Sequence, residues 1–241
     1  MAHPPIPWYL SMAVPDPLVP WQSRLTVSEL VEELHDQLIS HTTFPVTILG
    51  HSWGAWLSLL FAHRYPAMVQ QLILVGCAPF DDCYVPQIVQ RRRERLSQKQ
   101  RCRFNQVTEA LDSPGLAPTV KTVLLSDLQE LVKQTDNYCP PASTTIASFP
   151  KGQLYSAIWS EAAKLRNNKT FYRILPQLSC PVSLIHGKYD PHPIDGVTTP
   201  LDSCGVKYRL FLLDQCGHSP FLEQYAVSSF YGIVKQLVKM Y

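Results

Sequence analysis

Four short runs along the chain are apolar at most positions rather than at every second one. They are Val46–Leu49, Leu72–Val75, Val182–Ile185 and Tyr208–Leu213. Runs of this length and pattern are typical of strands that are buried on both faces of a sheet. We therefore predict a mostly parallel sheet, which needs helices on both faces to cover it.

Segments with helical periodicity separate these runs, as a parallel sheet requires. Thr26 and Glu29 have the spacing of a capping box at the start of a helix expected over 26–40. A second helix is expected over 53–63, and an amphipathic helix over 223–240 closes the chain. Strands that alternate with helices in this way place the protein in the α/β class.

The pattern changes in the segment 81–175, which is richer in charge, helical in period and without a strand-like run. We predict that it forms a helical cap inserted into an α/β core made of residues 1–80 and 176–241. Its dense basic run, Arg91–Arg95, is expected to be a solvated helix face.

Composition narrows the classes of protein that fit. The chain has 241 residues, 46% of them hydrophobic, which suffices for one sizeable core with an insertion. A net charge of +2 does not indicate a basic surface that binds nucleic acid. Seven cysteines without C-x-x-C or Cys/His spacing predict neither a metal site nor a disulfide framework, and no other cofactor motif is visible.

No secretory signal is recognisable at the start of the sequence, so we expect a cytoplasmic protein with reduced thiols. The apolar stretch 46–62 is shorter than a membrane span and is better explained as a buried strand and helix. The expected partner is a small-molecule substrate, with neither nucleic acid nor membrane, and the oligomeric state is left open.

The pentapeptide Gly50-His51-Ser52-Trp53-Gly54 lies between the first apolar run and the helix that follows it. In this G-x-S-x-G pattern a tight turn lifts the serine hydroxyl out of the end of the sheet, where a base can reach it. One glycine lets the chain turn, and the other lets the helix pack close to the strand. We predict that Ser52 is a nucleophile and that the Trp53 N–H donates to a developing oxyanion.

Chemistry-bearing residues follow the later strands as well. Asp190 comes shortly after the third run, and His218 comes after the fourth. Because the carboxyl ends of parallel strands meet at one edge of a sheet, we expect both residues near Ser52. A serine needs a histidine to take its proton, and the histidine needs an acid to fix its tautomer. We therefore predict a Ser52–His218–Asp190 triad.

Other residues compete for two of these roles. Asp81 and Asp82, which follow the second run, are alternatives to Asp190 as the acid. His218 is one of eight histidines and is preferred because it lies in a glycine-preceded loop after a late strand. His51 is expected to support the turn.

Together these segments resemble the α/β-hydrolase superfamily, and most nearly its cap-bearing, proline-iminopeptidase-like branch. The segments that carry the resemblance are Gly50–Leu57, Leu72–Gly76, His186–Pro193 and Cys216–His218. It extends over roughly residues 26 to 241. It implies Ser52, Asp190 and His218 as the triad and residues 81–175 as a cap over the active site.

The beginning of the chain departs from this family. Its members usually open with two or three further strands and a His-Gly loop that supplies the second oxyanion donor. Here the first 25 residues hold six prolines, and the first glycine is Gly50. A short strand over Tyr9–Val14 and proline-rich coil fit equally well, so we expect a sheet without the opening strands.

Three functions fit these observations. The leading hypothesis is a serine hydrolase that cleaves a small ester, amide or amino-terminal peptide bond. The alternative is a truncated, catalytically impaired homologue that serves as a binding protein, or an incomplete gene product. A non-hydrolytic enzyme on the same scaffold ranks last, because no cofactor motif supports it. An aminopeptidase would need carboxylates for the substrate amine, and Glu109, Asp127, Glu130, Asp136 and Glu161 are available.

Overall fold

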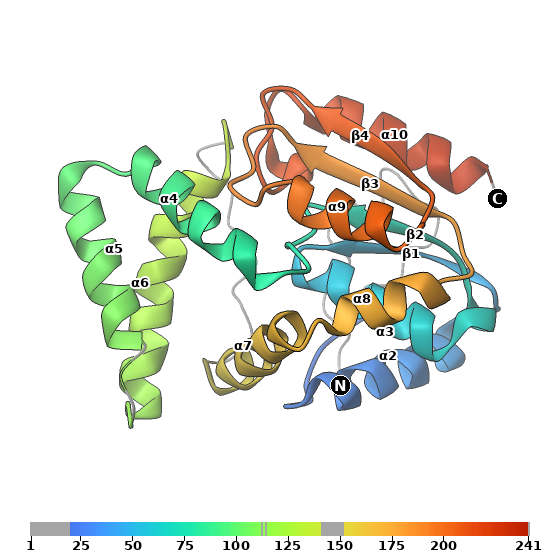
Figure 1. Cartoon of the computed structure of the whole chain (residues 1–241), viewed down its shortest axis with the longest axis horizontal. Helices are drawn as coiled ribbons and strands as arrows, with labels where there is room; N and C mark the ends of the chain where they lie inside the picture. Colours follow the sequence, from blue (N-terminus) through green and yellow to red (C-terminus); the bar gives the residue numbers. More distant parts are fainter. Residues whose placement is uncertain (1–19, 112, 114, 141–151, 241) are drawn as a thin grey trace.

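The computed structural model describes residues 20–240 apart from 112, 114 and 141–151 (Figure 1). The described residues form one sheet with the strand order β1-β2-β3-β4, and every neighbouring pair is parallel. The strands are β1 (Val46–His51), β2 (Val69–Val75), β3 (Val182–Gly187) and β4 (Tyr208–Leu213). The predicted parallel α/β fold is confirmed, and the strand expected over Tyr9–Val14 lies outside the described residues.

Helices fill the connections between the strands. They are α2 (Val27–His41), α3 (Trp53–Arg64), α4 (Val85–Arg95), α5 (Gln98–Leu111), α6 (Pro118–Asp136), α7 (Gly152–Asn167), α8 (Thr170–Ile174), α9 (Asp195–Ser203) and α10 (Val227–Lys239). At the start of α2, the Thr26 hydroxyl accepts a hydrogen bond from Glu29 N–H, as the capping-box spacing predicts. None of the described helices is both long and apolar enough to span a membrane.

Strand β2 shows why the buried strands are apolar at consecutive positions. Leu72 and Leu74 enter the larger hydrophobic core, to which α2, α3, α8 and α9 contribute. Ile73 and Val75 enter a second core, which α10 covers. Successive side chains of a strand point to opposite faces, so a strand with a core on each side must be apolar throughout.

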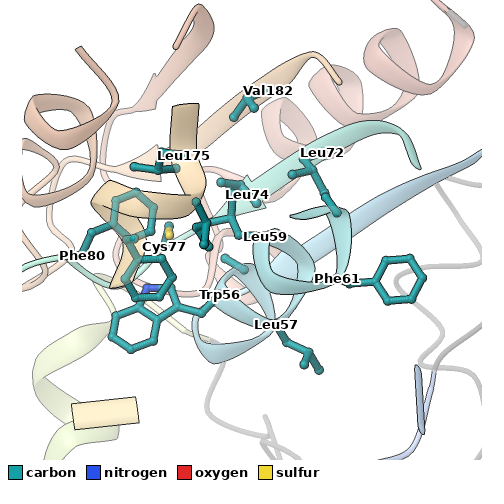
Figure 2. Close-up of a cluster of buried hydrophobic side chains, with 14 of the residues drawn as sticks. Trp56, Leu57, Leu59, Phe61, Leu72, Leu74, Cys77, Phe80, Leu175 and Val182 are labelled. Atoms are coloured by element: carbon teal, nitrogen blue, oxygen red, sulfur yellow. The ribbon is translucent and has the colours of Figure 1, made fainter. Parts of the chain in front are cut away.

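Aromatic side chains fill the larger core beside the helix that follows Ser52 (Figure 2). The rings of Trp56 and Phe171 lie 4.6 Å apart, and those of Phe80 and Phe171 lie 4.8 Å apart. The indole N–H of Trp56 donates to the Ala78 carbonyl at 2.9 Å, so its one polar atom is satisfied. This packing fixes α3 against the sheet, and α3 in turn fixes the turn that carries Ser52.

The described part of the segment 81–175 contains helices and no strand. Figure 1 shows α4, α5 and α6 grouped to one side of the sheet. They share a small core of their own, formed by Leu96, Phe104 and Leu131. The helical character of the segment is as predicted, while its division from the core as a separate cap stays a prediction.

A buried carboxylate ties this helical segment to the loop that follows β4. Glu223 is fully buried, and its oxygens accept hydrogen bonds from the N–H groups of Gly217, Tyr138 and Cys139, each at 2.7 Å. The approach is so close that a Cβ at Gly217 would lie 2.1 Å from the Asp136 carbonyl oxygen. Glu223 therefore sets the position of the loop that carries His218.

We predict that Glu223→Gln lowers the free energy of unfolding by about 3 kcal/mol, because bonds from N–H groups to an ionised carboxylate are among the stronger ones. In the variant, the amide oxygen can replace Oε1, but the NH₂ group then faces the Cys139 N–H donor. Asp214→Asn is the control, since Asp214 pairs with Lys188 in an exposed ion pair worth less than about 1 kcal/mol. Urea unfolding measures both, and equal losses in the two variants would contradict this role of Glu223.

Candidate active site

Ser52 lies on a strained turn between β1 and α3. Its backbone has φ 55° and ψ −117°, a conformation that non-glycine residues rarely adopt. The turn is held by a hydrogen bond from Ser52 N–H to the Val75 carbonyl at 2.9 Å. A Cβ at Gly50 would lie 2.4 Å from the Gly54 carbonyl oxygen, so Gly50 is the position where close approach requires glycine. Strain of this kind is characteristic of functional sites.

His218 is held on three sides in the loop after β4. Its N–H donates to the Asp136 carbonyl at 2.7 Å, and its own carbonyl accepts from His51 Nε2 at 2.9 Å. Its ring Nδ1 lies 2.8 Å from Asp190 Oδ2. His51 directly precedes Ser52. Its side chain, which we expected to support the serine turn, therefore connects this turn to the loop of His218.

The structure brings Asp190, rather than the competing acids, to His218. Asp81 forms an ion pair with Lys169, and Asp82 pairs with Arg166 at 2.7 Å. Neither of them contacts the His218 ring among the described hydrogen bonds. Within the described residues, the Ser52 hydroxyl makes no hydrogen bond to His218. Such contacts often tighten only when substrate is bound.

Asp190 is 1% exposed and is surrounded by histidines. Besides His218, the ring Nδ1 of His192 lies 2.8 Å from Oδ1, and His186 Nε2 lies 3.8 Å from Oδ2. Burial by itself would raise the pKa of this carboxyl, but the neighbouring histidines hold it well below its usual value. Asp190 is therefore ionised at neutral pH.

The histidines differ in their affinity for a proton. Burial lowers the pKa of His192 and of His186, and it brings the pKa of His51 to about 3. For His218, burial is outweighed by the attraction of Asp190, and its pKa is raised above the usual value. Of these four rings, His218 is the one placed to hold a proton taken from a neighbouring group.

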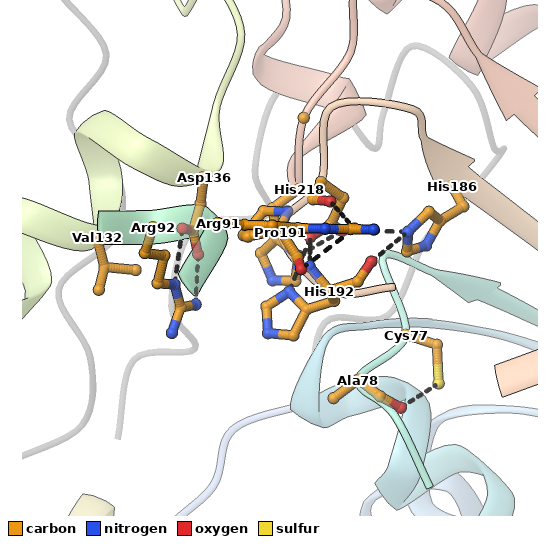
Figure 3. Close-up of polar contacts among 12 residues, drawn as sticks. Cys77, Ala78, Arg91, Arg92, Val132, Asp136, His186, Pro191, His192 and His218 are labelled. Atoms are coloured by element: carbon orange, nitrogen blue, oxygen red, sulfur yellow. Dashed lines mark hydrogen bonds and ion pairs between the residues drawn. The ribbon is translucent and has the colours of Figure 1, made fainter. Parts of the chain in front are cut away.

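The basic run of α4 is not the solvated face that its sequence suggested. Arg92 forms a two-pronged ion pair with Asp136 at 2.9 and 2.6 Å, with side chains only 18% and 5% exposed (Figure 3). Arg91 Nη1 donates to the carbonyls of Asp190 and Pro191 at 3.3 and 3.4 Å. The prediction of a solvated face was therefore wrong for Arg91 and Arg92. A run of charges in the sequence does not reveal acceptors on segments that are distant along the chain.

Arg95, the last arginine of the run, strengthens the same connection. Its Nη1 donates to the Thr135 carbonyl at 2.7 Å, and its guanidinium lies 3.6 Å from the centre of the Tyr189 ring. Arg93 is exposed, as expected for a solvated position. Helix α4 therefore contacts both the loop that carries Asp190 and the end of α6 that holds His218.

Trp53, the predicted oxyanion donor, lies at the start of the helix that follows Ser52. Trp53 is the first residue of α3, so its N–H has no acceptor within the helix and lies at the positive end of the helix dipole. The role of this N–H as an oxyanion donor stays a prediction. Residues 1–19, at the beginning of the chain where family members usually carry the second oxyanion donor, lie outside the described residues.

Asp190, His192 and His218 are also the one set of possible metal ligands that the described residues bring together. One donor atom of each lies within 4.8 Å of the others. Both ring Nδ1 atoms, however, are at hydrogen-bond distance from Asp190, and hydrogen bonds from the rings to the carboxylate account fully for these contacts. We interpret the set as a hydrogen-bonded network, and the expectation of no metal stays a prediction.

Comparison with solved structures shows the fold. VinJ is 17% identical, with 90% of this chain and 73% of that one covered and a TM-score of 0.60. The proline iminopeptidase of Mycobacterium smegmatis is 15% identical over 90% and 72% of the two chains, with a TM-score of 0.58. The monoacylglycerol lipase of Paleococcus ferrophilus is 15% identical over 89% and 76%, with a TM-score of 0.52.

Sequence comparison identifies the family. No curated protein sequence matches the chain at a significant level. Residues 10–227, however, match the sequence profile of the alpha/beta hydrolase family, and this match includes the serine turn and the loops of Asp190 and His218. The chain belongs to the alpha/beta hydrolase family.

Proposed function

We propose that this protein is a serine hydrolase that cleaves a small ester or amide through an acyl-enzyme on Ser52. The observation that carries the proposal is the hydrogen bond between the buried Asp190 carboxylate and His218, in a loop held against the strained Ser52 turn. The family supports hydrolytic chemistry in general. The role of each residue is inferred from its position and charge.

In the first half of the reaction, the Ser52 hydroxyl attacks the substrate carbonyl carbon while His218 Nε2 takes its proton. The Asp190 carboxylate stabilises the imidazolium that forms, and the Trp53 N–H donates to the oxyanion. His218 then gives the proton to the leaving alcohol or amine, and the acyl group remains on Ser52. In the second half, water attacks the acyl group in the same way, which releases the acid and restores the serine.

The described carboxylates favour a substrate without an obligatory free amine. Of the five considered as amine ligands, Asp136 pairs with Arg92, Asp127 pairs with Arg103, and Glu161 accepts the Val27 N–H at 2.6 Å. The other two, Glu109 and Glu130, are exposed. We therefore place an ester or an ordinary amide before an amino-terminal peptide bond as the substrate.

We predict that a fluorophosphonate probe labels the protein on Ser52 and that Ser52→Ala abolishes this label. His218→Ala and Asp190→Asn should slow labelling about a thousandfold or more, because the serine loses its base or the base loses its tautomer. Mass spectrometry locates the adduct. His63→Ala, which changes a histidine at the far end of α3, is the control and should label at the normal rate.

A folded protein that takes up no probe would instead favour the catalytically impaired homologue. Circular dichroism of each variant separates loss of chemistry from loss of fold. A label on another residue, unaffected by His218→Ala, would also overturn the proposal.

We predict a pH dependence of labelling that reflects the His218–Asp190 pair. The reaction needs neutral His218, and its pKa is raised, so the rate should rise with pH through a midpoint above that of an ordinary histidine. In Asp190→Asn the attraction is gone and burial dominates, so the midpoint should move to lower pH although the rate falls. Labelling rates from pH 5 to pH 9 measure both, and an unchanged midpoint in Asp190→Asn would refute this account.

A further inference from the structure

The two oxygens of Asp190 are divided between two imidazole rings. Oδ2 lies 2.8 Å from Nδ1 of His218, and Oδ1 lies 2.8 Å from Nδ1 of His192. The centres of the two rings are 4.5 Å apart, and their planes are inclined by 35°. Figure 3 shows the two rings side by side. The triad as predicted from the sequence accounts for His218 only.

His192 is fixed at both its backbone and its ring. Its N–H donates to the same Asp190 oxygen as its ring, at 2.9 Å, as an aspartate often bonds the backbone two residues ahead. Its carbonyl accepts from His186 Nε2 at 3.0 Å. Its side chain is 11% exposed. The ring is therefore held where it must share Asp190 with His218.

Sharing one carboxylate has an electrostatic consequence, because Asp190 carries a single charge. Two protonated rings beside it would leave one buried cation uncompensated, which is costly. The groups that act on these rings are His186 from β3, His51 from the serine turn, Arg92 from α4 and Asp136 from α6. Burial lowers the pKa of His192, so at neutral pH its ring is a neutral donor through Nδ1–H.

We propose that His192 is a positioning residue of the triad, which holds Asp190 Oδ1 so that Oδ2 faces His218. The inference rests on the proposed serine mechanism and adds a fourth residue to it. The bond from His192 also draws part of the carboxylate charge away from His218. It therefore limits how tightly Asp190 binds the imidazolium and keeps His218 able to act as a base near neutral pH.

Two variants distinguish the effect of the hydrogen bond that His192 donates from the effect of the space that its ring fills. In His192→Asn the side-chain amide nitrogen occupies about the position of the ring Nδ1, so the bond to Oδ1 is kept. In His192→Leu the side chain fills a similar volume but donates nothing. Because the His192 ring already excludes water from this position, Leu leaves the burial of His218 about the same.

We predict that His192→Leu slows probe labelling of Ser52 about tenfold. It should also move the midpoint of the pH profile to higher pH by about one unit. In this variant Oδ1 keeps only the backbone N–H of residue 192, so the carboxylate binds the His218 proton more tightly. In His192→Asn, the midpoint should move by at most about a quarter of the shift expected for His192→Leu, and most of the labelling rate should be recovered. A residue that served only to pack the loop would lower the melting temperature and leave the midpoint unchanged.

A second measurement keeps the inference independent of activity. Titration of the histidine ring signals by NMR in a Ser52→Ala background gives the pKa of His218 directly, with and without His192→Leu. A rise in the His218 pKa in the Leu variant supports the positioning role even if the wild type takes up no probe, in which case only the proposed function falls. An unchanged His218 pKa would overturn the inference.

Two further outcomes of the labelling experiment count against the proposal. If His192→Leu abolished labelling as completely as His218→Ala does, His192 would itself be a base rather than a positioning residue. If His192→Asn behaved like His192→Leu in its pH midpoint, the bond to Oδ1 would not be the feature that matters.

Discussion

The site depends on keeping one ionised carboxylate, that of Asp190, away from water. A buried charge without partners is costly, so a chain that places one there must surround it with donors. Here the donors are the rings of His218 and His192 and the N–H of His192, all within 2.9 Å. The same contact that stabilises Asp190 also orients His218 and raises its proton affinity, so one interaction meets both a structural need and the need of the proposed mechanism.

The surroundings of this carboxylate connect parts of the chain that are far apart in sequence. Arg91 on α4 donates hydrogen bonds to carbonyls of the Asp190 loop, and Arg92 forms an ion pair with the Asp136 side chain. The Asp136 carbonyl in turn receives the N–H of His218. A buried ion pair adds little net stability on balance, but it is strongly directional, and removing one partner leaves the other uncompensated. The helical segment thus holds the loops of Asp190 and His218 through fixed polar contacts.

The sequence predicted the parallel sheet because its signals are local. Apolar runs such as that of β2 follow from burial on both faces, and the capping box at Thr26 fixes the start of α2. The pattern Gly50–Gly54 likewise placed the serine turn. The order of chemistry-bearing residues then suggested which side chains would meet, because the ends of parallel strands lie at one edge.

What the sequence did not predict depends on contacts between distant segments. Arg92 and Asp136 are 44 residues apart, and a charge run on a helix is compatible with solvent as well as with a buried partner. In the sequence, His192 is only a near neighbour of Asp190. Its spacing of two residues from an aspartate is the signal that was available, since an aspartate side chain commonly bonds the backbone two residues ahead. The second bond, from the ring, required the folded loop.

The strained Ser52 turn shows how the hydrophobic core supports the candidate active site. Holding a non-glycine residue at φ 55° costs about 1–3 kcal/mol, which the surrounding structure must offset. Trp56, one turn along α3, is 2% exposed and packs on Phe171, while Gly50 lets α3 lie directly against β1. Burying one large aromatic side chain contributes free energy of the same size as the strain or larger. The core of the larger face therefore supplies the energy that keeps Ser52 out of its relaxed conformation, at the strand end where His218 is held.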